Sequence, residues 1–133
     1  MVLALAGVAL VVAVTLVMSD VSSLFMRRTA LMMVADDAAL AGANAIDVGA
    51  IYANGVGATL PLDPVLAGEL AQASVDAVVD ARLRDVRLES VRIAGEGVEV
   101  VVSAAVPAPM SGVTGNRTMR IRVRASAATP TRF

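Results

Sequence analysis

The first nineteen residues, MVLALAGVALVVAVTLVMS, contain no charged side chain. A helix over this segment would span about 28 Å, close to the hydrocarbon thickness of a bilayer. A cleaved secretory signal would have a basic start, a shorter apolar stretch and a small-residue cleavage site, none of which is clear here. We therefore expect residues 1–19 to enter a membrane. The alternative is a buried core helix, which few chains of 133 residues could cover.

The helical pattern continues beyond the apolar segment. The stretch from Ser19 to Asp47 contains no Pro, and Gly42 is the first Gly within it. Ala, Leu, Met and Arg, all good helix formers, dominate this stretch. We predict a helix over residues 1–50, about 75 Å long, which is more than twice the apolar thickness of a bilayer. Residues 51–133 are predicted to form a second unit, which we call the head domain.

Residues 35–47, ADDAALAGANAID, are mostly small. At 100° per residue, one face of this helix carries Ala35, Ala38, Ala39, Gly42, Ala45 and Ile46. The opposite face carries Asp36, Asp37, Leu40, Asn44 and Asp47. Because small side chains let helix backbones approach closely, we predict that the first of these faces is a helix-packing interface. Its partner is either another copy of the chain or the chain's own head domain.

Three charged residues follow the apolar segment. Asp20 and Arg27 are seven residues apart and lie on one stripe of the helix, and Arg28 lies two turns before Ala35. A charge at a packing surface is costly unless it is paired, so Asp20 is predicted to pair with Arg27 or Arg28 of its own chain or a neighbour. The alternative is that these side chains reach into lipid headgroups. By the positive-inside rule, the arginines taken alone would place the C-terminal side in the cytoplasm; the alternative is that a basic leader precedes Met1 and reverses this orientation.

The head domain is predicted to begin with a helix. Asp63 can cap this helix, Pro64 suits its first position, and the helical pattern extends to about Leu83. Its predicted apolar stripe is Val65, Leu66, Leu70, Ala73, Ala77 and Val78.

After Asp85 the apolar residues recur with a period of two. Residues 86–93 and 98–106 are predicted to form an antiparallel hairpin around Gly95 and Gly97. A Pro/Gly-rich loop over 107–116 precedes a third strand, 117–125. The inward side chains of the second and third strands are predicted to be Val98, Val100, Val102, Ala104, Val106, Met119, Ile121, Val123 and Ala125. The predicted fold class is α+β, with a long N-terminal helix and a second helix packed on a three-stranded antiparallel sheet of unspecified order.

The third strand directs a row of arginines, Arg120, Arg122 and Arg124, away from the core. We expect this row to face water, partly offset by Glu89 and Glu99; the alternative is that it binds an extracytoplasmic ligand. It has no interleaved aromatic residues for stacking on bases, so no nucleic acid partner is expected.

Composition excludes several kinds of site. The chain has no His and no Cys, which rules out disulfides, cysteine nucleophiles and His/Cys metal sites. No nucleophile–base pair is visible, so we predict no catalytic residues, no cofactor and no metal, and the chain is not expected to be an enzyme. The triplet NRT at Asn116 matches the glycosylation pattern, which occurs often by chance.

Charge is distributed unevenly along the chain. Residues 1–85 have four Arg and nine Asp/Glu, and residues 86–133 have seven Arg and three Glu. The two parts therefore have net charges of −5 and +4. The segregation is either chance or a sign that the acidic part of one copy meets the basic part of the next.

The apolar start, followed by DVSSLFMRRTALMMVADDAALAGANAID, resembles the N-terminal segment of TadE/TadG-like pilus-assembly proteins. In that family a membrane segment precedes an acidic residue, an Arg pair and an Ala-rich run; Asp20, Arg27, Arg28 and residues 35–43 match. The resemblance covers about residues 5–47. The glutamate that type IV-like pilins usually carry at mature position five corresponds to Leu5, counted from Met1.

The resemblance implies a pilin-like subunit of a bacterial tight-adherence (Flp-type) pilus. Such a subunit waits in the cytoplasmic membrane with its head extracytoplasmic. An assembly platform then packs it with other copies into a helical filament at the cell surface. The alternatives are a single-span, membrane-anchored binding module and a minor pilus-assembly protein.

Overall fold

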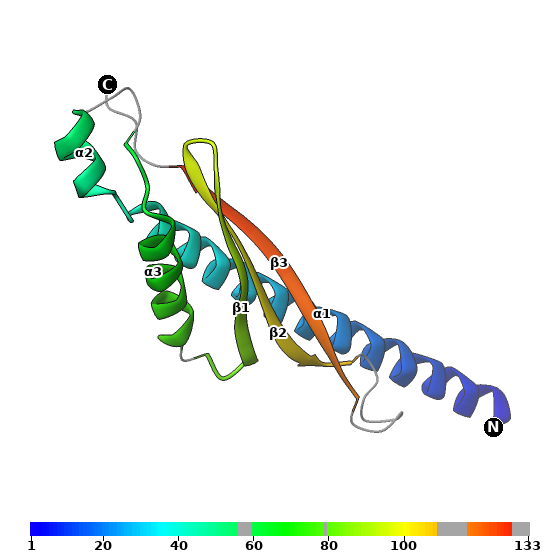
Figure 1. The fold of residues 1–133 in the computed structure, drawn as a ribbon. Coiled ribbons are helices and arrows are strands. Elements are labelled where there is room, and N and C mark those ends of the chain that lie inside the picture. The colour runs from blue at the N-terminus through cyan, green and yellow to red at the C-terminus, as the bar shows by residue number, and fades with distance from the viewer. Residues whose placement is uncertain (56–59, 79, 109–116, 129–133) are drawn as a thin grey trace.

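The computed structural model describes residues 1–55, 60–78, 80–108 and 117–128. Within these ranges the elements are α1 (Val2–Ala43), α2 (Val48–Asn54), α3 (Pro64–Asp76), β1 (Arg84–Ala94), β2 (Gly97–Pro107) and β3 (Thr118–Ala128). The sheet and α3 lie along the C-terminal half of α1, and the N-terminal half projects beyond them (Figure 1). The predicted α+β class, with a long apolar helix followed by a three-stranded antiparallel sheet, is confirmed. Asn116 and most of the predicted 107–116 loop lie outside the described residues.

Helix α1 has 42 residues and is therefore about 63 Å long. It ends at Ala43, so the predicted helix over 1–50 is too long. The chain next forms an isolated bridge between Ile46 and Leu62. The Asp47 carboxylate then accepts a hydrogen bond from the Ala50 N–H at 2.8 Å and caps α2. The bridge to Leu62 ends the helical course of α1, and the Asp47 cap starts α2 as a separate helix that extends through Asn54.

The sheet is an antiparallel meander in the order β1-β2-β3. The predicted hairpin between β1 and β2 is present, and Gly95 in its turn has a φ of +60°, a conformation that favours glycine. Gly97 has a different role from the predicted one. It is the first residue of β2, pairs with Ala128, and would place a Cβ atom 2.3 Å from the Ala127 carbonyl oxygen. Close approach of β3 therefore requires glycine at this position.

One face of the sheet forms the core. The five predicted inward residues of β2, from Val98 to Val106, are each at most 1% exposed. Val123 and Ala125 of β3 are also buried, and Ile121 packs against the core while half-buried. Met119, close to the start of β3, is 39% exposed and contributes little burial. The alternation read from the sequence is therefore confirmed for β2 and for most of β3.

Helices α1 and α3 cover this face of the sheet. The buried residues of α1 are Leu31, Val34, Ala35, Ala38, Ala39, Gly42 and Ala43, and those of α3 are Ala67, Ala71 and Val75. Of the predicted α3 stripe, Leu70 and Val78 pack against the core, whereas Val65, Leu66, Ala73 and Ala77 are exposed. The reason is the small residues of α1: they bring the two helices close together, so short side chains suit the contact better than Val65 or Leu66.

The ends of α3 are set by two aspartates. The Asp63 carboxylate accepts hydrogen bonds from the Val65 and Leu66 N–H groups, and Pro64 occupies the first turn, as predicted. The helix ends at Asp76 and not near Leu83. The Asp80 carboxylate accepts a hydrogen bond from the Arg82 N–H at 2.8 Å, an aspartate turn that ends the helical pattern.

We predict that Gly42→Leu destabilises the head domain. A Cβ atom at Gly42 would lie 3.1 Å from Val98 Cγ1 and 3.4 Å from the Ala67 carbonyl oxygen, so a leucine there overpacks the contact. The expected loss in the free energy of unfolding is about 1–3 kcal/mol, measured by denaturation of the full chain in detergent micelles. Gly68→Leu is the matched control, because a Cβ atom there meets nothing within 4 Å. Equal stability of the two variants would contradict the packing described here.

Candidate functional site

The N-terminal part of α1 is an apolar surface that the rest of the described chain leaves uncovered. All of residues 1–19 are exposed. An 18-residue window of α1 has a mean hydropathy of 2.6, and none of that window is buried. By length and composition this helix can cross a membrane. Its exposure distinguishes it from the core helix of a globular domain, which would have the same composition but would be covered.

The head-facing stripe of α1 begins immediately after the uncharged segment. Asp20, Leu24 and Arg27 are half-buried and precede the fully buried Leu31 at helical spacing. Arg27 donates a hydrogen bond from Nη1 to the Arg82 carbonyl oxygen and so ties α1 to the α3–β1 loop. Arg28 is exposed. The structure thus places Asp20 and Arg27 on one stripe, and the pairing of Asp20 with either arginine stays a prediction.

The small-residue face of α1 packs inside the chain's own head domain. Ala35, Ala38 and Ala39 are fully buried, and Gly42 lies against Val98. Ala45 is buried as well but follows the helix, and Ile46 is half-buried in its bridge to Leu62. The sequence left two packing partners open for this face, and in the structure the face packs against the chain's own head domain. The face is therefore covered within a single chain.

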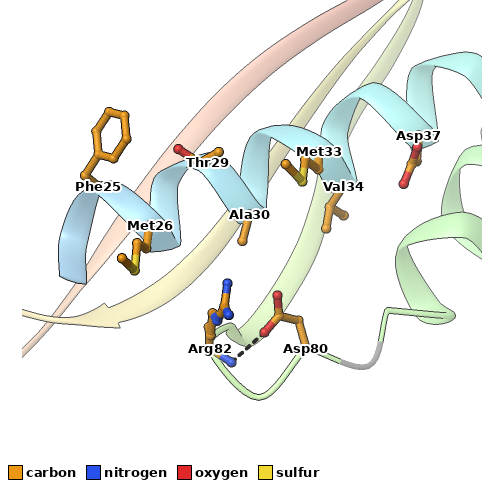
Figure 2. A pocket seen from close by; sticks show the side chains of 9 residues that line it. All are labelled: Phe25, Met26, Thr29, Ala30, Met33, Val34, Asp37, Asp80 and Arg82. Atoms are coloured by element: carbon orange, nitrogen blue, oxygen red, sulfur yellow. Dashed lines mark hydrogen bonds between the residues drawn. The ribbon is translucent and has the colours of Figure 1, made fainter. Parts of the chain in front are cut away.

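A groove of about 310 Å³ lies between α1 and the α3–β1 loop (Figure 2). It is lined by Phe25, Met26, Thr29, Ala30, Met33, Val34, Asp37, Asp80 and Arg82. Most of these side chains are apolar, and the charged ones are Asp37, Asp80 and Arg82. The sequence analysis missed this groove, because no sequence pattern shows where the α3–β1 loop lies along α1.

The outer face of the sheet carries the predicted arginine row, and carboxylates pair with it. Arg122 Nε lies 2.6 Å from Glu89 Oε2, and Arg124 Nε lies 3.6 Å from Glu99 Oε1. The expected offset of the row by Glu89 and Glu99 is confirmed. Arg120 forms an ion pair with Asp85, which the sequence analysis did not foresee.

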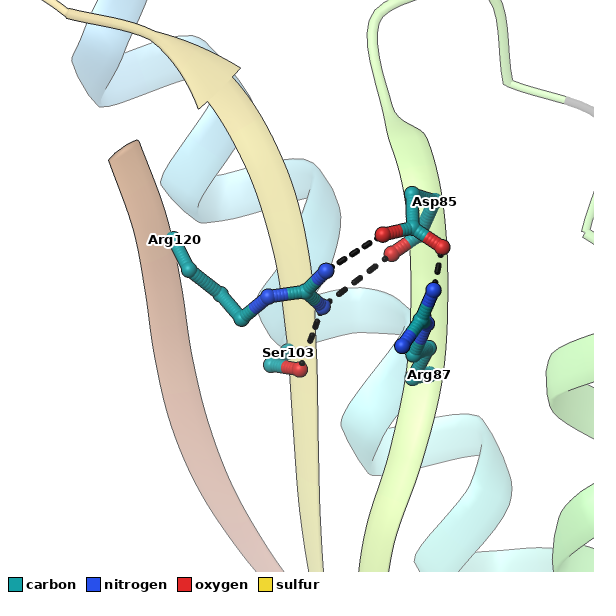
Figure 3. Close-up of polar contacts among 4 residues, drawn as sticks. All are labelled: Asp85, Arg87, Ser103 and Arg120. Atoms are coloured by element: carbon teal, nitrogen blue, oxygen red, sulfur yellow. Dashed lines mark hydrogen bonds and ion pairs between the residues drawn. The ribbon is translucent and has the colours of Figure 1, made fainter. Parts of the chain in front are cut away.

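The Asp85 carboxylate contacts Arg87 of its own strand and Arg120 of β3, on the far side of β2 (Figure 3). It lies at an irregularity of β1 between Arg84 and Arg87 and has a φ of 51°, a left-handed conformation that aspartate tolerates better than most residues. Its carboxylate binds Arg120 and, at 2.8 Å, Nε of Arg87. Arg120 also donates from Nη1 to the hydroxyl of the buried Ser103 at 3.1 Å.

These contacts lower the pKa values of two carboxyl groups. Hydrogen bonds from Arg120 and then Arg87 hold the pKa of Asp85 below its ordinary value. For Glu89 the first cause of the lowered pKa is a hydrogen bond from Ser103, and Arg122 adds to it. The outer face of the sheet is therefore an internally paired network, and an anionic ligand would have to displace its carboxylates.

No metal-binding cluster is present in the described ranges. Among those residues, no group of three or more His, Cys, Asp and Glu side chains is placed to hold a metal ion. The surfaces described so far are the exposed part of α1, the groove and the paired arginine row on the outer face of the sheet.

Comparison with known proteins links the first of these surfaces to a family. Residues 1–45 match the model of the Flp pilus-assembly family described as TadE/G-like. The match covers α1 and ends before α2, so α2, α3 and the sheet lie outside it. No curated protein and no solved structure matches the chain. The resemblance inferred from Asp20, the arginine pair and the Ala-rich run is confirmed, and it associates the chain with the Flp/Tad pilus.

We predict that acid destabilises the head domain through Asp85 and Glu89. Because the folded state lowers both pKa values, it binds fewer protons in acid than the unfolded state does. Their contribution is fully present above about pH 5 and is lost as the pH falls through the lowered pKa values. The midpoint of thermal unfolding should therefore fall in acid.

The double variant Asp85→Asn/Glu89→Gln should show a smaller fall of this midpoint than the wild type. Glu69→Gln, on the exposed surface of α3, controls for the loss of a negative charge. An unchanged acid dependence in the double variant would show that the network does not stabilise the fold.

Proposed function

We propose that this chain is a pilin-like structural subunit of a bacterial Flp/Tad-type pilus. Residues 1–19 hold it in the cytoplasmic membrane before assembly, and the same part of α1 packs with other copies in the filament core afterwards. The head domain lies outside the cytoplasm and forms the filament surface. The family match over residues 1–45 supports the pilus context.

The observation that carries this proposal is the continuity of α1. Anchoring alone needs about 20 apolar residues and tolerates a flexible linker before the head. Here a single 42-residue helix runs from the exposed apolar segment into the centre of the head, where Leu31 and Ala35 are fully buried. The head is thus held at a fixed position and angle relative to the apolar segment. Regular self-association needs this property, because every subunit must present the same surfaces in the same relation.

The apolar segment also suits close contact between helices. A Cβ atom at Gly7 would meet no heavy atom within 4 Å apart from the neighbouring backbone of its own helix. Small residues at Ala4, Ala6, Gly7, Ala9 and Ala13 allow neighbouring backbones to approach, which drives helix association in lipid and in bundles. Since the small-residue face near Ala38 is covered by the head, contacts between subunits fall to residues 1–19 and to the outer surfaces.

The alternative of a membrane-anchored binding module has less support. It would use the arginine row of β3, yet Arg120, Arg122 and Arg124 already contact carboxylates of the same chain. The alternative of a minor assembly protein shares the anchor and the head. A minor assembly protein differs from a filament subunit in that the filament would contain few copies of it.

Filament content tests the proposal directly. Filaments sheared from cells should contain this chain as an abundant component by mass spectrometry, and deletion of its gene should remove them from electron micrographs. A trace amount with filaments retained would favour the minor assembly protein. Detection in the membrane fraction alone, with filaments unaffected by deletion, would favour the anchored binding module.

Cysteine cross-linking locates the subunit contact, because the chain contains no cysteine of its own. Single variants Val8→Cys, Ala9→Cys and Leu10→Cys point in directions about 100° apart and so sample most of the helix circumference. We expect oxidation of filaments to give disulfide-linked dimers from at least one of them. Tyr52→Cys, exposed on α2, is the control and should stay monomeric. Monomers from all three helix variants would contradict a filament core made of this segment.

A further inference from the structure

One end of the head domain faces the apolar segment of α1. Val98, near the start of β2, lies against Gly42 in the last turn of α1. The opposite end is tied to Arg27 by the hydrogen bond to the carbonyl oxygen of Arg82. Strand β2 therefore runs back along α1 toward its N-terminus (Figure 1). By strand register, β1 and β3 begin at the end where β2 finishes, and we call this end of the head the proximal end.

The proximal end lies just beyond the lipid headgroups when residues 1–19 span a bilayer. The first charged residue of the chain after Met1 is Asp20, where the head-facing stripe also begins. Arg27 is seven residues further, about 10 Å along the helix. The polar layer of a bilayer adds about 5–7 Å beyond the hydrocarbon on each side. The loop that Arg27 holds is therefore adjacent to the headgroups.

Four arginines gather at this proximal end from four segments of the chain. Arg28 lies on α1, Arg82 in the α3–β1 loop, Arg84 at the start of β1 and Arg117 just before β3. All four are exposed, and we call them the basic collar. The ion pairs found among the described residues use other arginines, on the outer face of the sheet.

Fewer carboxylates than arginines lie near this end. Asp85 is held by Arg87 and Arg120, whereas Asp80, which accepts a hydrogen bond from the backbone N–H of Arg82, and Asp37 line the groove beside Arg82 and keep their negative charges. With Arg27, the four arginines of the basic collar outnumber Asp20, Asp37 and Asp80, so the proximal end has a net positive charge.

Apolar side chains stand at the same level of α1. Phe25 is 71% exposed and Met26 is 58% exposed, and both line the groove beside Arg82. An aromatic or flexible apolar side chain next to arginine is typical of protein surfaces at a membrane interface. This composition fits a lipid surface better than bulk water.

We propose that the basic collar binds the phosphate groups of anionic phospholipids in the leaflet that the head faces. Guanidinium groups bind phosphate through paired, charge-assisted hydrogen bonds, which are stronger than those they make with water. The head then stands against the membrane in one orientation. The proposal requires only that residues 1–19 span a membrane, and it is independent of any role in a pilus.

The test uses the full chain reconstituted in vesicles of phosphatidylcholine, alone or mixed with phosphatidylglycerol. A donor fluorophore on Ala81→Cys, in the exposed α3–β1 loop, reports energy transfer to an acceptor-labelled lipid headgroup. A donor on Tyr52→Cys, in α2 at the opposite end of the head, is the control. Transfer from position 81 should be higher in the anionic vesicles and should fall to the phosphatidylcholine level in high salt. Transfer from position 52 should not change.

Substitutions identify the groups responsible. Arg82→Gln/Arg84→Gln should weaken the headgroup contact by about 25-fold, taking roughly fivefold per arginine near an anionic surface. Arg92→Gln, an exposed arginine toward the other end of β1, should have no effect. Equal transfer in the two kinds of vesicle, or an equal effect of Arg92→Gln, would overturn the proposal. So would transfer that rises with the protein-to-lipid ratio, because the collar would then be contacting a second copy of the chain.

Discussion

The close approach of α1 to β2 and α3 around Gly42 determines where the rest of the head domain lies. Only 2% of the residues are aromatic, so the core has to be filled by short aliphatic side chains. Such a core reaches normal packing density only if the backbones come close together. Gly42 and the alanines of α1 allow this approach on one side, and Ala67 and Ala71 of α3 allow it on the other. The valines of β2 then fill the space between the helices and the sheet.

This packing divides α1 into two parts with different surroundings. Beyond Asp20 the helix buries one stripe and exposes Asp36, Asp37 and Leu40 on the other side, as in an ordinary amphipathic helix. Before Asp20 it is apolar on every side and covered on none in the described structure. Because the small-residue face is used within the head, it no longer competes for contacts between chains. The part of α1 that matches a pilus-assembly family thus contains both the membrane-competent surface and the central helix of the head.

Features set by local chemistry could be predicted from the sequence, and features set by distant contacts could not. The Asp63–Pro64 start of α3 and the alternation of β2 depend on neighbouring residues, and both were predicted correctly. The end of α1 at Ala43 depends on the bridge from Ile46 to Leu62, and the buried stripe of α3 depends on the partner helix. Each needs a contact that no local pattern contains. The role of Asp85 likewise depends on a strand irregularity that turns its carboxylate toward Arg120.

The arginines show why net charge along the sequence is a poor guide to charge on the surface. The sequence divides into an acidic part that ends at residue 85 and a basic part that follows it. In the folded chain, the same charges are grouped differently from their order in the sequence. Arg122 and Arg124, of the basic part, are paired by Glu89 and Glu99 on the outer face of the sheet. Arg82 and Arg84, of the acidic part, instead join Arg117 at the proximal end of the head. Antiparallel register, which returns β3 to the end where β1 begins, is what brings positive charge from both parts together beside the apolar segment.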